Sequence, residues 1–154
     1  MPNRRFDWHE HIKDVEKEYK AARLAVDRLA AGLTASPDAI TDDETRAYLR
    51  NADANLEGTY IVRLFAAFEA ALRSYDRARH NDPTREQVAS VLIDTTGGRR
   101  RQGISATVRQ GAHEVRIVRN FWAHESDEAP PPMSIADARR RLQLFLSWLP
   151  DEWP

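Results

Sequence analysis

The stretch ISATVRQGAHEVRIVRNFWAH, residues 104–124, decides the fold class of this chain. At about 100° per residue, its apolar residues fall on one stripe, the pattern of an amphipathic helix that faces a core. These residues are Ile104, Val108, Val115, Val118 and Trp122. The acidic and proline-rich segment ESDEAPPP follows and cannot extend a helix, so we expect the helix to end near His124.

Helical periodicity also dominates the rest of the chain, and no stretch alternates as a strand does. In residues 6–32, apolar residues recur at spacings of four and three, a seam that runs from Trp8 to Leu33. Residues 56–79 form the strongest predicted core helix, with Ile61, Phe65, Phe68, Leu72 and Tyr75 on its inner face. A shorter helix is expected to end at Thr95 and a last one at Leu149. The pattern predicts an all-α antiparallel bundle of four long helices with one or two short ones, in a single domain over residues 1–154.

The predicted helix starts follow from capping residues. Thr41 with Glu44 has the form of a capping box, and the thin apolar pattern of residues 42–55 predicts a partly exposed segment or a kink near Gly58. Thr84 is expected to cap the short helix, with Val88, Val91 and Leu92 facing inward. Ser134, with Asp137 in the box position, is expected to cap the last helix, and DEWP at the end is expected to be a tail.

Composition narrows the possible functions. A net charge of −1 argues against broad electrostatic attraction to nucleic acid, so any RNA contact must be local. Arginine far outnumbers lysine, which suits phosphate recognition but also follows from a GC-rich coding bias. There is no Cys, no ligand set that predicts a metal or cofactor site, and no run near the roughly 20 apolar residues of a membrane span. We therefore expect a cytoplasmic protein without membrane contact.

The end of the 104–124 stretch carries the candidate site, Arg119-Asn120-Phe121-Trp122-Ala123-His124. The same Arg-to-His spacing recurs elsewhere in the chain. Only this copy ends an amphipathic helix and has a polar residue directly after the Arg. In a helical protein it resembles the HEPN superfamily, whose members include metal-independent ribonucleases with an Arg, four to six residues, then His.

The resemblance implies a chemical role for each motif residue. Arg119 would bind the scissile phosphate, because a guanidinium stays charged and offers a planar fork to phosphate oxygens. His124 would act as acid or base, because histidine titrates near neutral pH. Asn120 would orient one of the two. The resemblance implies attack by the RNA 2′-hydroxyl and a 2′,3′-cyclic phosphate product.

Glu69 falls near the middle of the apolar face of residues 56–79, where a carboxylate needs a partner. Its partner is either Arg73, one turn further along the same helix, or Arg119 across the bundle. Many HEPN families resemble the second arrangement, with an acidic residue on an earlier helix. Full burial would make its removal cost roughly 3–5 kcal/mol.

Other arginines are candidates for RNA contact. Arg99, Arg100 and Arg101 lie in a glycine-flanked loop that either grips RNA phosphates or is simply solvated. Arg116 shares the polar face of residues 104–124 with Asn120, and we expect it to contact RNA as well.

The spacing of the motif imposes a geometric condition. Arg119 and His124 lie about 140° apart on an ideal helix, so they do not face one phosphate from regular turns. Either the helix unwinds before His124, or two copies of the chain build the site. HEPN nucleases resemble the second case, and the long apolar seam also suits an interface, so we expect a homodimer.

Two further alternatives concern biological role. HEPN toxins silenced by a nucleotidyltransferase carry Tyr two residues after the motif His, where this chain has Ser126, so that control is not expected. A toxin or defence role with some other antitoxin protein remains a hypothesis. HEPN-like bundles also serve as non-catalytic binding modules, in which Arg119 and Glu69 would form a structural ion pair.

Overall fold

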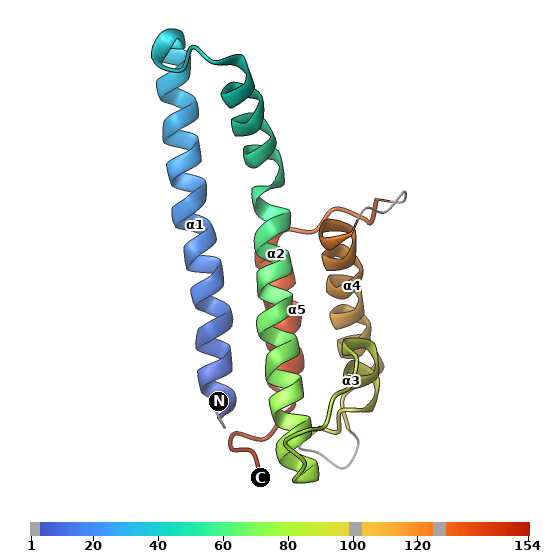
Figure 1. Cartoon of the computed structure of the whole chain (residues 1–154). Coiled ribbons are helices and arrows are strands. Elements are labelled where there is room, and N and C mark those ends of the chain that lie inside the picture. Colours follow the sequence, from blue (N-terminus) through green and yellow to red (C-terminus); the bar gives the residue numbers. More distant parts are fainter. Residues whose placement is uncertain (1–3, 99–102, 125–128) are drawn as a thin grey trace.

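The computed structural model describes residues 4–98, 103–124 and 129–154. Within these ranges the chain folds into helices and forms no strand; its elements are α1 (Arg5–Ala35), η1 (Pro37–Ala39), α2 (Asp43–His80), α3 (Ala89–Thr95), α4 (Ala106–Ala123) and α5 (Ile135–Leu146). The helices α1, α2, α4 and α5 run alternately up and down (Figure 1). The predicted all-α antiparallel bundle is therefore confirmed. No helix in the described ranges is long and apolar enough to cross a membrane.

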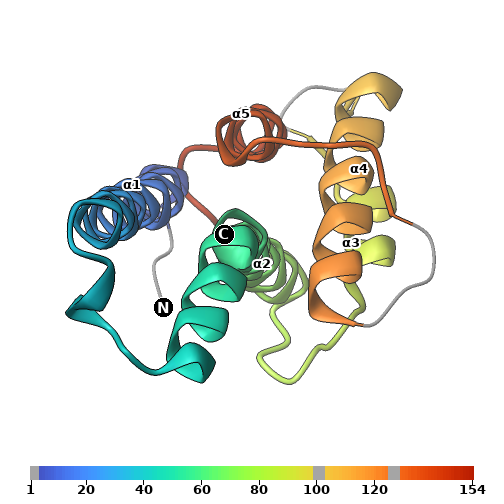
Figure 2. The same ribbon diagram turned by 90° about the horizontal axis from the view of Figure 1, so that it is seen from above.

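Helix α2 is the centre of the bundle, and not α4, from which the sequence analysis started. It contacts α1, α3, α4 and α5, and an end-on view shows these helices arranged around it (Figure 2). The reason lies in its buried residues, which cover about 200° of its circumference at 100° per residue. They are Gly58, Ile61, Leu64, Phe65, Ala67, Phe68, Ala71, Leu72, Ser74 and Tyr75.

The core is aromatic at the crossing of α2 with α5. Phe68 meets Phe145 edge-on at 5.3 Å between ring centroids and lies 5.7 Å from Phe65. All three rings are fully buried. Such pairs add about 0.5–1.5 kcal/mol beyond the area that they bury.

The predicted core stripe of α4 is correct except at its end. Ile104, Val108, Val115 and Val118 are buried, but Trp122 is 39% exposed. A side chain at Gly58 would overlap the Trp122 indole. Trp122 therefore lies at the edge of the bundle, over a position of α2 that offers only backbone.

Helix α2 is capped by Asp42 and not by Thr41. The Asp42 carboxylate accepts hydrogen bonds from the backbone N–H groups of Glu44 and Thr45, two donors that the first turn leaves unpaired. From there α2 runs unbroken through Gly58, so the predicted partial exposure is present without a break in the helix.

The prediction for the short helix was wrong at its start. Thr84 bonds to Asp82 in the turn that follows α2, and α3 begins only at Ala89. As a consequence Val88 and Val91 are 61% and 38% exposed, while the inward residues are Leu92 and Ile93.

The C-terminal residues are not a tail. Ser134 caps α5 as predicted, accepting from the Asp137 N–H at 3.1 Å, but the helix ends at Leu146 and the chain then folds back. The backbone of Asp151 accepts from the N–H of Arg5 at 3.0 Å, which joins the two ends of the chain.

Trp153 is the anchor of this last segment. It stacks on Trp8 at 6.2 Å, meets Tyr75 edge-on at 5.6 Å and is only 7% exposed. The C-terminus is therefore part of the core.

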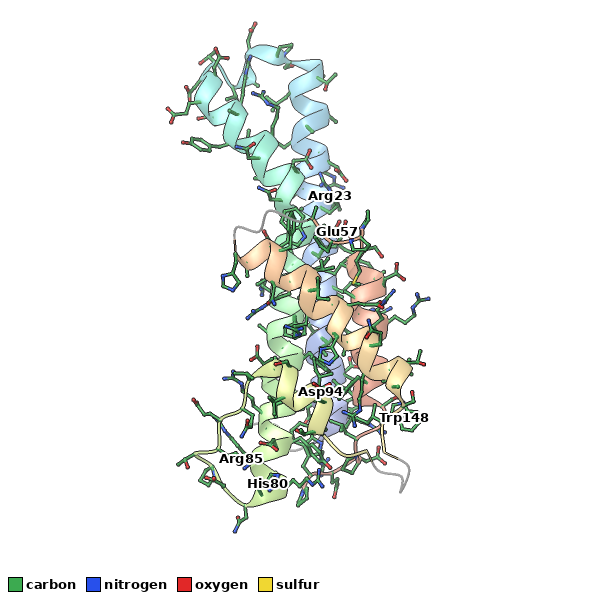
Figure 3. The ribbon with its side chains drawn as sticks, turned by 90° about the vertical axis from the view of Figure 1, so that its right-hand side faces the viewer. Arg23, Glu57, His80, Arg85, Asp94 and Trp148 are labelled. Atoms are coloured by element: carbon green, nitrogen blue, oxygen red, sulfur yellow. The ribbon has the colours of Figure 1, made fainter. Side chains whose placement is uncertain are left out.

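Helices α1 and α2 extend beyond the other helices as a hairpin (Figure 1). We call residues 20–56 the arm. Its base lies at the start of α5, where the Ile135 N–H donates to the Glu57 carboxylate at 2.8 Å; Figure 3 labels Glu57 there. The seam of α1 is buried at Trp8, Ile12 and Val15 but not within the arm.

Candidate functional site

Arg119 lies near the end of α4, with its side chain between α4 and α2. Its guanidinium lies 5.7 Å from the centre of the Phe65 ring, a cation–π contact. One Nη donates to the Asn120 side-chain oxygen at 3.0 Å, and the other lies 3.9 Å from the Glu69 carboxylate. The side chain remains 29% exposed. The arrangement orients a permanent cation and leaves part of it open to an anion from solvent.

Both partners expected for Glu69 are present, at different distances. Its carboxylate lies 2.7 Å from Arg73 on the same helix and 3.9 Å from Arg119 across the bundle, and its side chain is 16% exposed. The close pair is therefore the one within α2, and Glu69 supports Arg119 more loosely than Asn120 does. The Nε atoms of both arginines are buried without a hydrogen-bond partner, so each guanidinium retains an unsatisfied donor.

The partial exposure of Glu69 lowers the cost expected for its removal. Glu69→Gln keeps the shape and removes a charge shared by two arginines, so we expect a loss of about 1 kcal/mol in urea unfolding, well below the value for a fully buried charge. Glu18→Gln is the matched control, because its pair with Arg63 is about half exposed on both sides, and it should cost under about 0.5 kcal/mol. Equal effects of the two variants would contradict a role for Glu69 in positioning arginine.

His124 has left the helix. It is the C-cap residue of α4, with φ −136° and ψ 145°, although its N–H still donates to the Asn120 carbonyl at 3.0 Å. Its side chain is exposed. Because the backbone becomes extended at His124 itself, the direction of its side chain departs from the 140° separation of an ideal helix. The helix thus ends at His124 and does not unwind before it, because Ala123 is still helical and the His124 N–H still makes a helical hydrogen bond.

Arg116 belongs to a network that the sequence analysis missed. Its Nε donates to His113 Nδ1 at 3.3 Å, and His113 Nε2 lies 2.8 Å from the Asp94 carboxylate on α3; Figure 3 labels Asp94. Because Nδ1 accepts, the neutral ring carries its proton on Nε2 and donates it to Asp94. The i, i+3 spacing of His113 and Arg116 was visible in the sequence, but the pairing with Asp94 depends on how α3 packs against α4.

A shallow hollow of about 260 Å³ lies beside the Glu69–Arg73 pair on α2. Ala66 and Ala70 form its small-residue floor, and Arg73 and Arg77 line it. Arg77 is held at the far end by its hydrogen bond to the Arg85 carbonyl at 3.0 Å. The surface next to Arg119 is thus concave and rich in arginine.

The remaining predicted site residues, Arg99, Arg100 and Arg101, lie outside the described residues, as does Ser126. Among the residues that the structure describes, no three His, Asp or Glu side chains gather as metal ligands. No protein-family model, curated protein or solved structure matches this chain.

Proposed function

We propose that this protein is a metal-independent endoribonuclease of the HEPN type. The observation that carries the proposal is that an oriented, partly exposed Arg119 and an exposed His124 both lie at the end of the same helix, α4. A toxin or defence role, held in check by an antitoxin protein, is part of this proposal and rests on the motif alone.

The proposed reaction uses the two groups for different tasks. The RNA 2′-oxygen attacks the adjacent phosphorus while the bond from phosphorus to the 5′-oxygen breaks, which gives a 2′,3′-cyclic phosphate and a free 5′-hydroxyl. His124 removes the 2′-hydroxyl proton or supplies the one that the 5′-oxygen gains. Arg119 stabilises the extra negative charge on the phosphate oxygens, with Asn120 holding its guanidinium.

In the proposed arrangement, one chain supplies the whole site. The extended φ and ψ of His124 turn its side chain away from the direction that it would take in a continued helix. A site built from two copies stays the alternative arrangement. Arg116, tied to His113, and the hollow lined by Arg73 and Arg77 extend the basic surface along which RNA phosphates would lie.

A second candidate function is a non-catalytic binding module. It is favoured by the contacts of Arg119 with Glu69, Asn120 and Phe65, which hold its guanidinium as in a structural ion pair. The two candidates differ in one measurable property, which is the cleavage of RNA.

The test is single-turnover cleavage of a mixed RNA pool in the presence and absence of EDTA. We expect equal rates in both and fragments ending in 2′,3′-cyclic phosphate by mass spectrometry. Arg119→Lys keeps the charge but loses the planar fork, so it should be slower by up to about 10²-fold at an unchanged melting temperature. Absence of cleavage by the wild type would favour the binding module.

A further inference from the structure

The arm lacks a core of its own. Between Glu16 and Gly58 no residue of the chain is buried, although 41 consecutive residues, 17–57, lie in this interval. Helices of this length are marginally stable in water unless an apolar face is covered. The rest of the bundle does not cover it, since α4 and α5 reach only to the arm's base.

An apolar groove runs along one side of the arm, between α1 and α2. It is a hollow of about 310 Å³ lined on α1 by Val26, Leu29, Ala30 and Leu33 and on α2 by Leu49 and Ala52. Leu29 is 42% exposed. The groove continues the heptad seam that is buried lower down at Trp8, Ile12 and Val15. The same pattern that packs in the bundle is therefore uncovered in the arm.

Two charged residues on α2 indicate which partner fits this groove. Arg50 lines the groove, is exposed and has no ion-pair partner among the described residues. Asp43, one heptad earlier, falls on the same face of α2. Its side chain is 97% exposed and meets Arg46 only at 3.9 Å. A cation and an anion thus lie seven residues apart beside one apolar groove, each without a close partner.

We propose that the arm of a second copy of this chain covers the groove, in an antiparallel arrangement about a two-fold axis. A two-fold operation brings the same surface of both copies together. With the axis midway between Asp43 and Arg50, each Asp43 faces the Arg50 of the other copy, so both charges gain partners. Leu29 and Leu33 on α1 lie level with this part of α2, because the contact between Arg23 and Asp53 sets the register of the two helices lower in the arm. In the proposed dimer these two leucines pack against the same leucines of the second copy.

The two arms then form a four-helix bundle, in which each supplies two helices and the seam residues fill the middle. Arg119 of each candidate site lies at the level of Phe65, about 28 Å from the axis along α2, because a helix rises 1.5 Å per residue. The two sites of the dimer are therefore roughly 55 Å apart along α2, and each belongs to one chain. This inference does not depend on the proposed function. The interface that it proposes lies in the arm, whereas the dimer expected from the sequence would bring both motifs to one shared cleft.

The test is the mass of the protein by light scattering at micromolar concentration. The wild type should give twice the chain mass of 17.7 kDa. Leu33→Glu should give a monomer with unchanged helicity by circular dichroism, because Leu33 is not buried within its own chain. A monomeric wild type, or a Leu33→Glu dimer, would overturn the proposal.

A charge exchange tests the orientation. Asp43→Arg and Arg50→Asp should each weaken the dimer by about tenfold, since two pairs are lost per dimer. The double variant Asp43→Arg/Arg50→Asp should regain affinity, because the exchanged charges pair again. Glu44→Arg is the control and should leave the dimer unchanged, because Glu44 lies about 100° from Asp43 around α2 and does not line the groove. A double variant no tighter than the single ones would contradict the antiparallel pairing.

One further variant separates this interface from a shared site. Ile117 is 46% exposed and lies on α4 one heptad before His124, so we expect a dimer in which both motifs face one cleft to cover it. Ile117→Glu should leave the dimer mass unchanged. If it gives a monomer while Leu33→Glu does not, the interface is on α4 and the proposal is wrong.

Discussion

Replacing His124 by alanine is expected to slow single-turnover RNA cleavage by about 10²–10⁴-fold, the usual contribution of a general acid or base. The melting temperature should stay almost unchanged. The side chain is exposed, and the contact of this residue with α4 is made by its backbone N–H, which alanine retains. The variant therefore separates chemistry from folding.

His80→Ala is the matched control. His80, labelled in Figure 3, is also an exposed histidine at the C-terminal end of a helix, and its ring pairs with Asp76 at 3.4 Å. Its loss should leave the cleavage rate unchanged. If His124→Ala cleaves as fast as His80→Ala, His124 moves no proton and the binding module becomes the better interpretation.

Trp153→Ala is expected to lower the free energy of unfolding by about 3–5 kcal/mol, the range for removing a large buried aromatic ring. The indole stacks on Trp8 from the first turns of α1 and meets Tyr75 from the last turns of α2. Its removal leaves a cavity between three segments that the ring holds together. Urea denaturation followed by circular dichroism measures the loss.

Glu152→Ala is the control for the same segment. Its ion pair with Arg4 spans 3.7 Å between side chains that are 76% and 69% exposed, so its loss should cost under about 0.5 kcal/mol. If Trp153→Ala costs no more than this, the C-terminal segment does not pack on the bundle in solution.

Several features of the fold could be predicted because they depend on residues close together in the chain. The apolar stripe of α4 gave Val108, Val115 and Val118 as core residues, and all three are buried. The cap of α5 at Ser134 follows from a hydroxyl three residues before an acidic residue. Helical periodicity and capping act within a few turns, so they are legible without a partner helix.

Two of the wrong predictions arose because neighbouring residues compete for the same local contact, and a third arose where a helix extends past the core. The cap of α2 is Asp42, one residue after Thr41, because the carboxylate reaches two N–H groups of the first turn. Thr84 hydrogen-bonds to Asp82 in the turn after α2 and does not cap a helix, and α3 begins later, at Ala89. Trp122 fits the helical stripe, yet it extends past the core and lies on Gly58.

In the candidate site, too, some features could be predicted from the sequence and others could not. Its Arg119, Asn120 and His124 could be selected from the sequence, because the motif stands at the end of a recognisable helix. The partner of Glu69 could not be selected, since Arg73 and Arg119 are both within reach and only the crossing of α2 and α4 sets the distances of 2.7 and 3.9 Å.

The sequence by itself determined that this chain is helical, where most helices lie, and which faces are apolar, because those properties follow from periodicity along one helix. Only the tertiary structure decided that α2 is the central helix, that Trp153 belongs to the core, and that Asp94 meets His113. These contacts join residues on different helices. Their existence depends on where the helices cross and end, and no local pattern of residues encodes that geometry.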